Sequence, residues 1–192
     1  KTNALVQYIL ETSKPKKGTF KHIFLCYKTD EPLYDMLKEE LGSKFISCYK
    51  SVAEFPDVQQ FADHSEDKYL VIFDDCINDK DKVSRKKMAD YFTFSRKKSI
   101  TCCFLAQSYY STDKFFRQQM TYMIITSINS VKDLKAILKE YQIGKVELTQ
   151  IVSMFENATD KTQDPDDLPF FKIDLNACPL SKKFSKNFLE YY

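Results

Sequence analysis

The segment YLVIFDDCIND, residues 69–79, places two adjacent aspartates directly after an apolar run. Apolar runs of this length are typical of buried strands, and the carboxyl end of such a strand opens onto the rim of an α/β sheet. At that rim Asp74 could hold a divalent cation, mostly through water, while Asp75 polarises an attacking water molecule. The run could also be an ordinary strand that ends in turn-forming aspartates, and both interpretations stay open at this point.

The first two residues, Lys1 and Thr2, lead directly into an apolar helical pattern. A Lys-Thr pair before a helix is the end of the phosphate-binding loop GxxxxGK[ST], in which the lysine contacts the β- and γ-phosphates and the hydroxyl binds Mg²⁺. The glycine-rich half does not precede Lys1, so we expect a P-loop domain that lacks its first strand and its glycine loop. A Lys-Thr start could arise by chance, but the strand ending in Asp74 and Asp75, a Walker B pattern, favours the motif and predicts ATP and Mg²⁺ as cofactors.

Another apolar run, ITCCFLAQS at residues 100–108, ends in Gln107 and Ser108. If this run is a strand beside the one that carries Asp75, its polar end meets the same edge of the sheet. A glutamine there could sense the γ-phosphate or position a water molecule. It could equally well cap the following turn, and the residues alone do not separate these interpretations.

Two other classes of function fit part of this pattern. A metal-dependent nuclease could use Asp74, Asp75 and Asp79 to hold two cations, and it would cut DNA without ATP. A noncatalytic P-loop-like assembly module would keep the fold and bind a partner through its aromatic C-terminal tail. Neither alternative requires Lys1 and Thr2 together with Gln107.

The composition indicates one globular domain that spans residues 1–192, with a C-terminal tail from residue 175. The chain has 192 residues, of which 43% are hydrophobic, and a formal net charge of +2. This size allows one sizeable core. No apolar run approaches the ~20 residues that span a bilayer, and no signal peptide is recognisable, so we expect a soluble protein with no membrane partner.

Strand-like and helical patterns alternate along the chain, which predicts an α/β fold with three layers around a mainly parallel central sheet. Helical spacing of apolar residues is found around residues 5–9, 32–41, 130–141 and 148–155, and residues 50–68 read as a short helix and a surface loop. The strand-like runs cover residues 22–27, 44–49, 69–73, 100–106, 122–128 and 169–174.

Three segments together resemble the poxvirus-type DNA-packaging ATPases of large DNA viruses, virophages and Polinton-like elements, within the FtsK/HerA branch of P-loop motors. They are YLVIFDDCIND, DYFTFSRKKSITCCFLAQSYYSTDKFFRQQMTYMII, and FFKIDLN with the terminal FSKNFLEYY. The most specific block runs from Arg96 through Gln107 to Arg117. The absent glycine loop is the departure from the family pattern.

The resemblance implies a RecA-like core and a pentameric or hexameric homo-oligomeric ring that threads double-stranded DNA into a preformed capsid with ATP. Catalysis would fall to Asp75, Gln107 and an arginine supplied by the neighbouring subunit. Arg96 is the first candidate for that arginine and Arg117 the second. Capsid or portal proteins would be partners, and the location would be the host-cell cytoplasm, a viral factory or the virion.

Contact with DNA would be made by phosphate-binding lysines and arginines, since a packaging motor must tolerate any sequence. The segment NDKDKVSRKK, residues 78–87, follows the two aspartates and supplies four candidates: Lys80, Lys82, Arg85 and Lys86. A lysine-rich helix can also be a plain solvated surface. The stretch KKFSK, residues 182–186, has the same ambiguity, because its aromatic neighbours could pack the tail onto the domain.

Overall fold

The structure, a computed structural model, describes residues 1–12, 19–76, 79, 81–128, 130–141, 143–144, 146–160 and 168–192. Its internal contacts define two compact units. The parallel-sheet unit comprises Thr2 and Ile9–Gln119, and the antiparallel-sheet unit comprises Lys1, Asn3–Tyr8 and Met120–Tyr192. The single domain expected over residues 1–192, with its tail from residue 175, stays a prediction.

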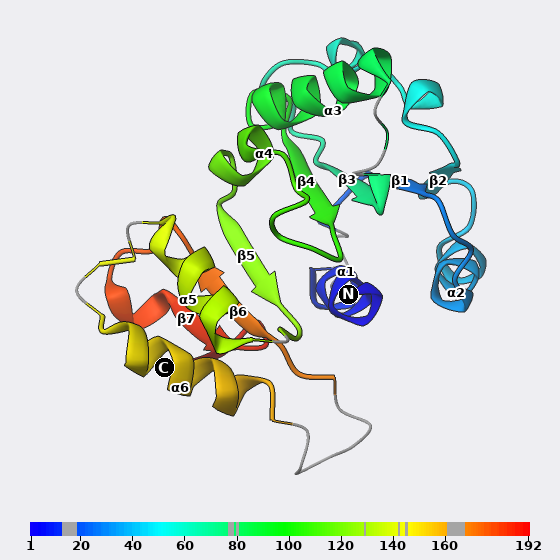
Figure 1. Cartoon of the computed structure of the whole chain (residues 1–192). Coiled ribbons are helices and arrows are strands. Elements are labelled where there is room, and N and C mark those ends of the chain that lie inside the picture. Colours follow the sequence, from blue (N-terminus) through cyan, green and yellow to red (C-terminus); the bar gives the residue numbers. More distant parts are fainter. Residues whose placement is uncertain are drawn as a thin grey trace. The chain divides into compact units, whose positions relative to one another are not determined.

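Four parallel strands form the sheet of the first unit, in the order β2-β1-β3-β4 (Figure 1). The strands are β1 (His22–Tyr27), β2 (Ile46–Tyr49), β3 (Tyr69–Asp74) and β4 (Ile100–Leu105). In this register Asp74 pairs with Tyr27 on one side and Leu105 on the other. The carboxyl ends of β1, β3 and β4 are therefore level, and the residues that follow them share one edge of the sheet. The predicted α/β fold with a parallel sheet is confirmed.

One face of this sheet is covered by α3 (Lys82–Phe94), as Figure 1 shows. An aromatic cluster packs on the same face. The 3₁₀ turns Val52–Glu54 and Val58–Gln60 lead into Phe55 and Phe61, and both rings lie edge-on to Tyr91 of α3. These turns occupy the stretch for which the sequence predicted a short helix. Aromatic residues bury large apolar areas, so the cluster anchors α3 firmly to the sheet.

The opposite face carries α2 (Pro32–Leu41), whose Tyr34 is fully buried and lies 5.0 Å from the ring of Tyr27. Proline at the first helical position and Gly42 at the end bound this helix, and its residues match the predicted helical range 32–41. Gly42 has φ +69°, a conformation that glycine adopts without strain. The helices α1 (Thr2–Thr12) and α4 (Lys114–Gln118) complete the first half of the chain.

The second sheet is antiparallel, with the order β5-β6-β7-β8. Its strands are β5 (Tyr122–Ile125), β6 (Phe171–Asp174), β7 (Phe184–Lys186) and β8 (Glu190–Tyr191), and its helices are α5 (Val131–Lys139), α6 (Leu148–Ala158) and the 3₁₀ turn Leu180–Lys182. The runs at residues 122–128 and 169–174 thus pair with each other rather than in the parallel sheet, which corrects the expected pairing. A short apolar run specifies a strand but not its direction.

The C-terminal segment packs onto this second sheet. Phe184 is buried and its ring stacks on Phe171, while Phe188 packs against Phe170 and Tyr8. The neighbouring Lys183 is also buried and donates a hydrogen bond to a backbone carbonyl. These contacts favour the packing interpretation of KKFSK over DNA contact.

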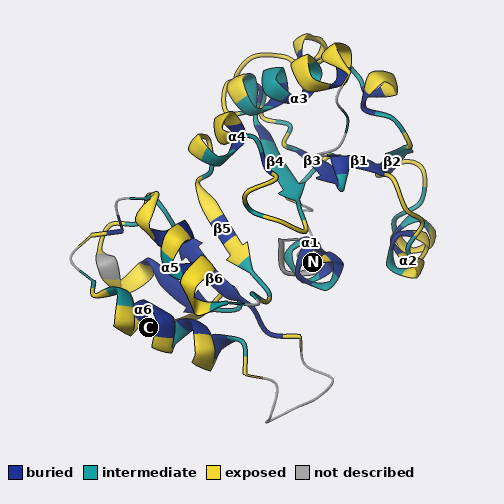
Figure 2. Ribbon diagram, in the orientation of Figure 1, coloured by how far each residue is buried: buried dark blue, intermediate teal, exposed yellow. Residues whose placement is uncertain are grey.

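Burial differs between the strands of the parallel sheet. β3 is buried along nearly its whole length, whereas most residues of β4 are only half-buried (Figure 2). Within the described part of the chain, no helix combines the length and the apolar character that crossing a membrane would require. β3 is therefore the central strand that carries Asp74 out to the sheet edge.

Candidate functional site

Asp74 is the last residue of β3 and is 4% exposed. Because side chains alternate along a strand, it points to the same face as Leu70 and Ile72, the face that α2 covers. There its Oδ2 atom accepts a hydrogen bond of 2.7 Å from the hydroxyl of Tyr34. The carboxylate is thus held by a residue 40 positions earlier in the chain.

Thr2 joins the same network. It is the first residue of α1, is 7% exposed, and donates from Oγ1 to Oε2 of Glu31 over 2.5 Å. Its hydroxyl also lies beside that of Tyr34. Thr2 and Asp74, the two residues that the sequence predicts to hold Mg²⁺, therefore both contact Tyr34.

The protonation state of Tyr34 fixes the direction of its bond to Asp74. Burial is the main reason that the pKa of Tyr34 lies far above its usual value, and the hydrogen bond to Asp74 raises it further. Contact with Thr2 acts weakly in the opposite direction. Tyr34 is consequently the hydrogen-bond donor at any physiological pH, and Asp74 accepts.

Asp75 turns out of the strand direction. It has φ +51°, in the left-handed region that aspartate and asparagine tolerate better than most residues. Its backbone N–H still donates to the carbonyl of Leu105, so the ladder to β4 continues through the turn. The turned carboxylate accepts a 2.9 Å hydrogen bond from Nε2 of Gln107, two residues after the end of β4.

The donor set fits a magnesium ion of the kind that P-loop proteins bind. Mg²⁺ prefers oxygen ligands and keeps several waters, so one hydroxyl and one carboxylate besides phosphate oxygens are sufficient. No group of three or more His, Cys, Asp and Glu side chains suited to a metal lies among the residues described. Asp79 forms an ion pair with Lys28 at 2.8 Å instead of joining Asp74 and Asp75.

Lys1 precedes α1, is exposed, and accepts a hydrogen bond at its carbonyl from Leu5. It is assigned to the antiparallel-sheet unit. Its predicted contact with phosphates stays a prediction.

The two candidate arginines lie in different surroundings. Arg96 is exposed in the turn before β4, at the amino end of the strand. Arg117, on α4, is stacked over the rings of Tyr109 and Tyr110 at 4.8 and 5.8 Å. β4 spans roughly 17 Å at about 3.3 Å per residue, so its length separates Arg96 from Gln107 of the same chain.

The four DNA-binding candidates also differ from one another. Lys80 lies outside the described residues. Lys82 and Lys86 are exposed on α3, whereas the exposed Arg85 forms an ion pair with Asp113. Lys82 and Lys86 thus remain on a solvated helix face, in line with either interpretation of this segment.

Sequence reasoning missed Glu31 and Tyr34. Tyr34 lies three residues before Leu37, and these two are the buried residues of α2. A polar group on the buried stripe of a helix is a signal that could have been used, because a buried hydroxyl requires a partner. The identity of that partner depends on the tertiary fold.

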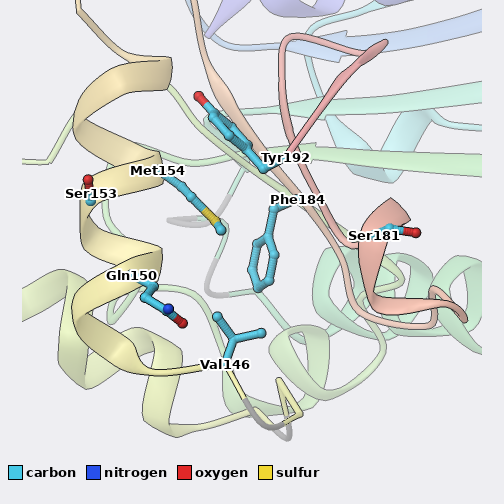
Figure 3. A pocket seen from close by; sticks show the side chains of 7 residues that line it. All are labelled: Val146, Gln150, Ser153, Met154, Ser181, Phe184 and Tyr192. Atoms are coloured by element: carbon cyan, nitrogen blue, oxygen red, sulfur yellow. The ribbon is translucent and has the colours of Figure 1, made fainter.

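The antiparallel-sheet unit has a hollow of about 490 Å³ beside α6. Figure 3 shows Met154 and Gln150 of the helix facing Phe184 and Tyr192 across it. None of the predicted site residues lines this hollow, which is mostly apolar. We assign it no part in the chemistry.

Two comparisons with known proteins bear on this site. A search of curated proteins finds no match. A family model described as Poxvirus A32 protein matches residues 6–164. The match covers β3, β4 and the residues that follow them, and therefore includes Asp74, Asp75 and Gln107. A32 is the poxvirus DNA-packaging ATPase-like protein, and membership of its family implies a P-loop ATPase. The chain belongs to the Poxvirus A32 protein family.

Proposed function

We propose that this protein is an ATP-driven translocase of double-stranded DNA that packages a viral genome into a preformed capsid as a homo-oligomeric ring. The observation that carries the proposal is the meeting of Thr2 and Asp74 around Tyr34, with Asp75 and Gln107 at the same sheet edge. Such an edge of a parallel sheet is where α/β proteins bind ligands.

Thr2 and Asp74 would hold Mg²⁺, and Lys1 would contact the β- and γ-phosphates of ATP. The metal would neutralise charge on the phosphate oxygens as the terminal phosphoryl group is transferred. Burial of both oxygen ligands supports this role, since Asp74 and Thr2 are each less than a tenth exposed. Both side chains are kept in place by hydrogen bonds rather than by solvent.

Asp75 would orient and polarise the attacking water. Its carboxylate is less buried than that of Asp74, and Gln107 donates to one of its oxygens. The amide of Gln107 would limit the rotation of the carboxylate and could report the state of the terminal phosphate. Such positioning supplies much of the rate in phosphoryl transfer.

Arg96 would serve the site of the neighbouring subunit. It is exposed, it lies at the opposite end of β4 from Gln107, and its turn is fastened by the ion pairs of Lys97 and Lys98 with Asp63. A braced, outward-facing guanidinium suits transfer of charge to a partner's transition state. The stacking of Arg117 on two tyrosines makes it the weaker candidate.

Lys82 and Lys86 would contact DNA phosphates from the exposed side of α3, with Lys80 and Arg85 nearby in sequence. Capsid or portal proteins would be the other partners, and the protein would act in the host-cell cytoplasm, in a viral factory or at the virion. The ring would have five or six subunits.

ATP hydrolysis with and without double-stranded DNA tests this proposal. The assay uses a form in which a strand and a glycine-rich phosphate-binding loop precede Lys1. We expect double-stranded DNA to stimulate ATP hydrolysis. The Asp75→Asn variant should bind ATP without hydrolysing it, and added Arg96→Ala subunits should inhibit hydrolysis by the wild type. Absence of hydrolysis in every oligomeric state would reject the motor.

A nuclease and a noncatalytic assembly module give different outcomes in the same assay. A nuclease would cleave DNA with Mg²⁺ alone, and the ion pair between Asp79 and Lys28 argues against the three-carboxylate site that it would need. An assembly module would keep its function when Asp75 is changed to Asn. DNA cleavage without ATP thus identifies a nuclease, and the Asp75→Asn variant separates an assembly module from the motor.

A further inference from the structure

The first turn of α2 carries two polar side chains that point into the site instead of stabilising their own helix. Glu31 is the N-cap residue of α2, yet its side chain makes no capping hydrogen bond. Its carboxylate accepts the hydrogen of Thr2 instead. Tyr34, one turn later, is 0% exposed and donates to Asp74.

The hydroxyl of Tyr34 is not required for packing. The ring already contacts Tyr27 at 5.0 Å, and a phenylalanine would fill almost the same volume. Burying a hydroxyl costs free energy unless it is hydrogen-bonded, and this one donates to Asp74 and lies beside Thr2, the two predicted metal ligands. The hydroxyl therefore matters chiefly for where Thr2 and Asp74 lie.

The bond between Thr2 and Glu31 has a related consequence for the ligand atom. A neutral hydroxyl binds a cation through an oxygen lone pair, so its hydrogen must go to another acceptor. Glu31 accepts a hydrogen bond of 2.5 Å from Thr2, so the lone pairs of Oγ1 point away from Glu31. Partners of this type orient metal ligands and raise their basicity.

We propose that Glu31 and Tyr34 are positioning residues that fix Thr2 and Asp74 as the oxygen ligands of a divalent cation. The inference rests on the proposed function, since it assumes that these two residues bind the metal of a metal–nucleotide complex. The first turn of α2 is thus the outer layer of the cation site, although it lies far from Thr2 and Asp74 in sequence.

The test compares Tyr34→Phe with Tyr91→Phe. Tyr91 is also 0% exposed and donates to the carbonyl of Pro56, so its variant loses a buried hydroxyl on the opposite face of the sheet. Mn²⁺ binding is measured by electron paramagnetic resonance with a nonhydrolysable ATP analogue, and binding of the analogue in EDTA is measured separately. We expect Tyr34→Phe to weaken Mn²⁺ binding about 10-fold and to leave metal-free binding unchanged. Tyr91→Phe should change neither.

Glu31 is tested by rescue. Glu31→Ala removes the acceptor of the Thr2 hydrogen and should weaken Mn²⁺ binding about 10-fold, whereas Glu31→Gln retains a carbonyl acceptor and should recover most of the loss. Circular dichroism confirms that each variant is folded. Equal Mn²⁺ affinity in Glu31→Ala and the wild type would overturn the role of Glu31.

The outcomes separate this inference from the proposed function. If Asp74→Asn abolishes Mn²⁺ binding and Tyr34→Phe does not weaken it, the site stands and the positioning role of Tyr34 is wrong. If Tyr34→Phe and Tyr91→Phe weaken binding equally, the hydroxyl serves stability only, and the role is again wrong. If the unmutated protein, in the form with a complete phosphate-binding loop before Lys1, binds no Mn²⁺–nucleotide complex, the proposed function and the inference both fail.

Discussion

Lys97 and Lys98, which follow Arg96 in the turn before β4, form ion pairs with the same carboxylate, but only Lys98 is buried. Lys97 and Lys98 both form ion pairs with Asp63 at 2.7 Å. The Lys98 side chain is 9% exposed and also donates to the carbonyl of Phe61, whereas that of Lys97 is 57% exposed. We predict that Lys98→Met destabilises the protein much more than Lys97→Met.

The expected magnitudes follow from these contacts. Methionine retains the apolar length of the side chain, so Lys98→Met removes mainly the two polar contacts. A hydrogen bond that involves a charged group contributes about 1.5–3 kcal/mol, and the change leaves the Phe61 carbonyl without its charged donor. We expect a loss of ~2 kcal/mol. An exposed ion pair contributes ~0–1 kcal/mol, so Lys97→Met should cost at most about 0.5 kcal/mol.

Urea denaturation monitored by circular dichroism measures both changes, since the chain has no tryptophan for fluorescence. The comparison is valid where the dependence of the free energy on urea stays the same in all variants. Equal losses in the two variants, or a loss below about 0.5 kcal/mol in Lys98→Met, would refute the argument from burial. The Arg96 turn would then owe its rigidity to its backbone hydrogen bonds.

Three further predictions concern the same unit. Hydrogen bonds with Lys97 and Lys98 lower the pKa of Asp63 from its usual 3.8 to about 2. The ionised Asp63 therefore stabilises the protein fully above pH 3.8, and this stabilisation is lost as the pH falls toward 2. The stability of the wild type and of Asp63→Asn should therefore differ most above pH ~4, and the difference should shrink as the pH falls from ~4 to ~2. A difference that is as large at pH ~2 as at pH ~5 would contradict this origin. Phe55→Ala should cost about 3–5 kcal/mol in urea unfolding, because Phe55 is 2% exposed between Phe73 and Tyr91; a cost under ~1 kcal/mol would mean that the cluster re-packs. Gly42→Ala should cost about 1–3 kcal/mol from backbone strain alone, since φ +69° with ψ 161° is a region essentially restricted to glycine and an added Cβ meets nothing within 4 Å. Gly42→Asn should cost about as much, because asparagine tolerates the left-handed helical region and not this one; a clearly smaller cost for asparagine would contradict this origin.

The edge that carries the site could be predicted from the sequence because it depends on local patterns. Apolar runs with polar ends at Asp74 and Gln107 specify strands, and alternation with helices specifies parallel pairing. Together these patterns require both residues to emerge at one edge. The hydrogen bond between Gln107 and Asp75 is the direct result.

The rest depended on contacts that no local pattern encodes. Tyr34 reaches Asp74 only because α2 folds back over β1 and β3, and the sequence shows just a tyrosine on an apolar stripe. The antiparallel pairing of residues 122–125 with 171–174 depends on chain direction across a long connection. Strands β7 and β8 are short and polar in part, so their pairing is decided by burial of Phe184.

The left-handed backbone at Asp75 makes one experiment unusually clean. Asparagine matches aspartate in size and tolerates φ +51° equally well, so Asp75→Asn changes the charge while the turn and the Leu105 bond stay in place. A glutamate would reach further by one methylene group, but it would have to adopt a backbone conformation that longer side chains seldom take. At this position the turned backbone, rather than a longer side chain, sets where the carboxylate lies. The choice of a short carboxylate here is a matter of backbone geometry as much as of chemistry.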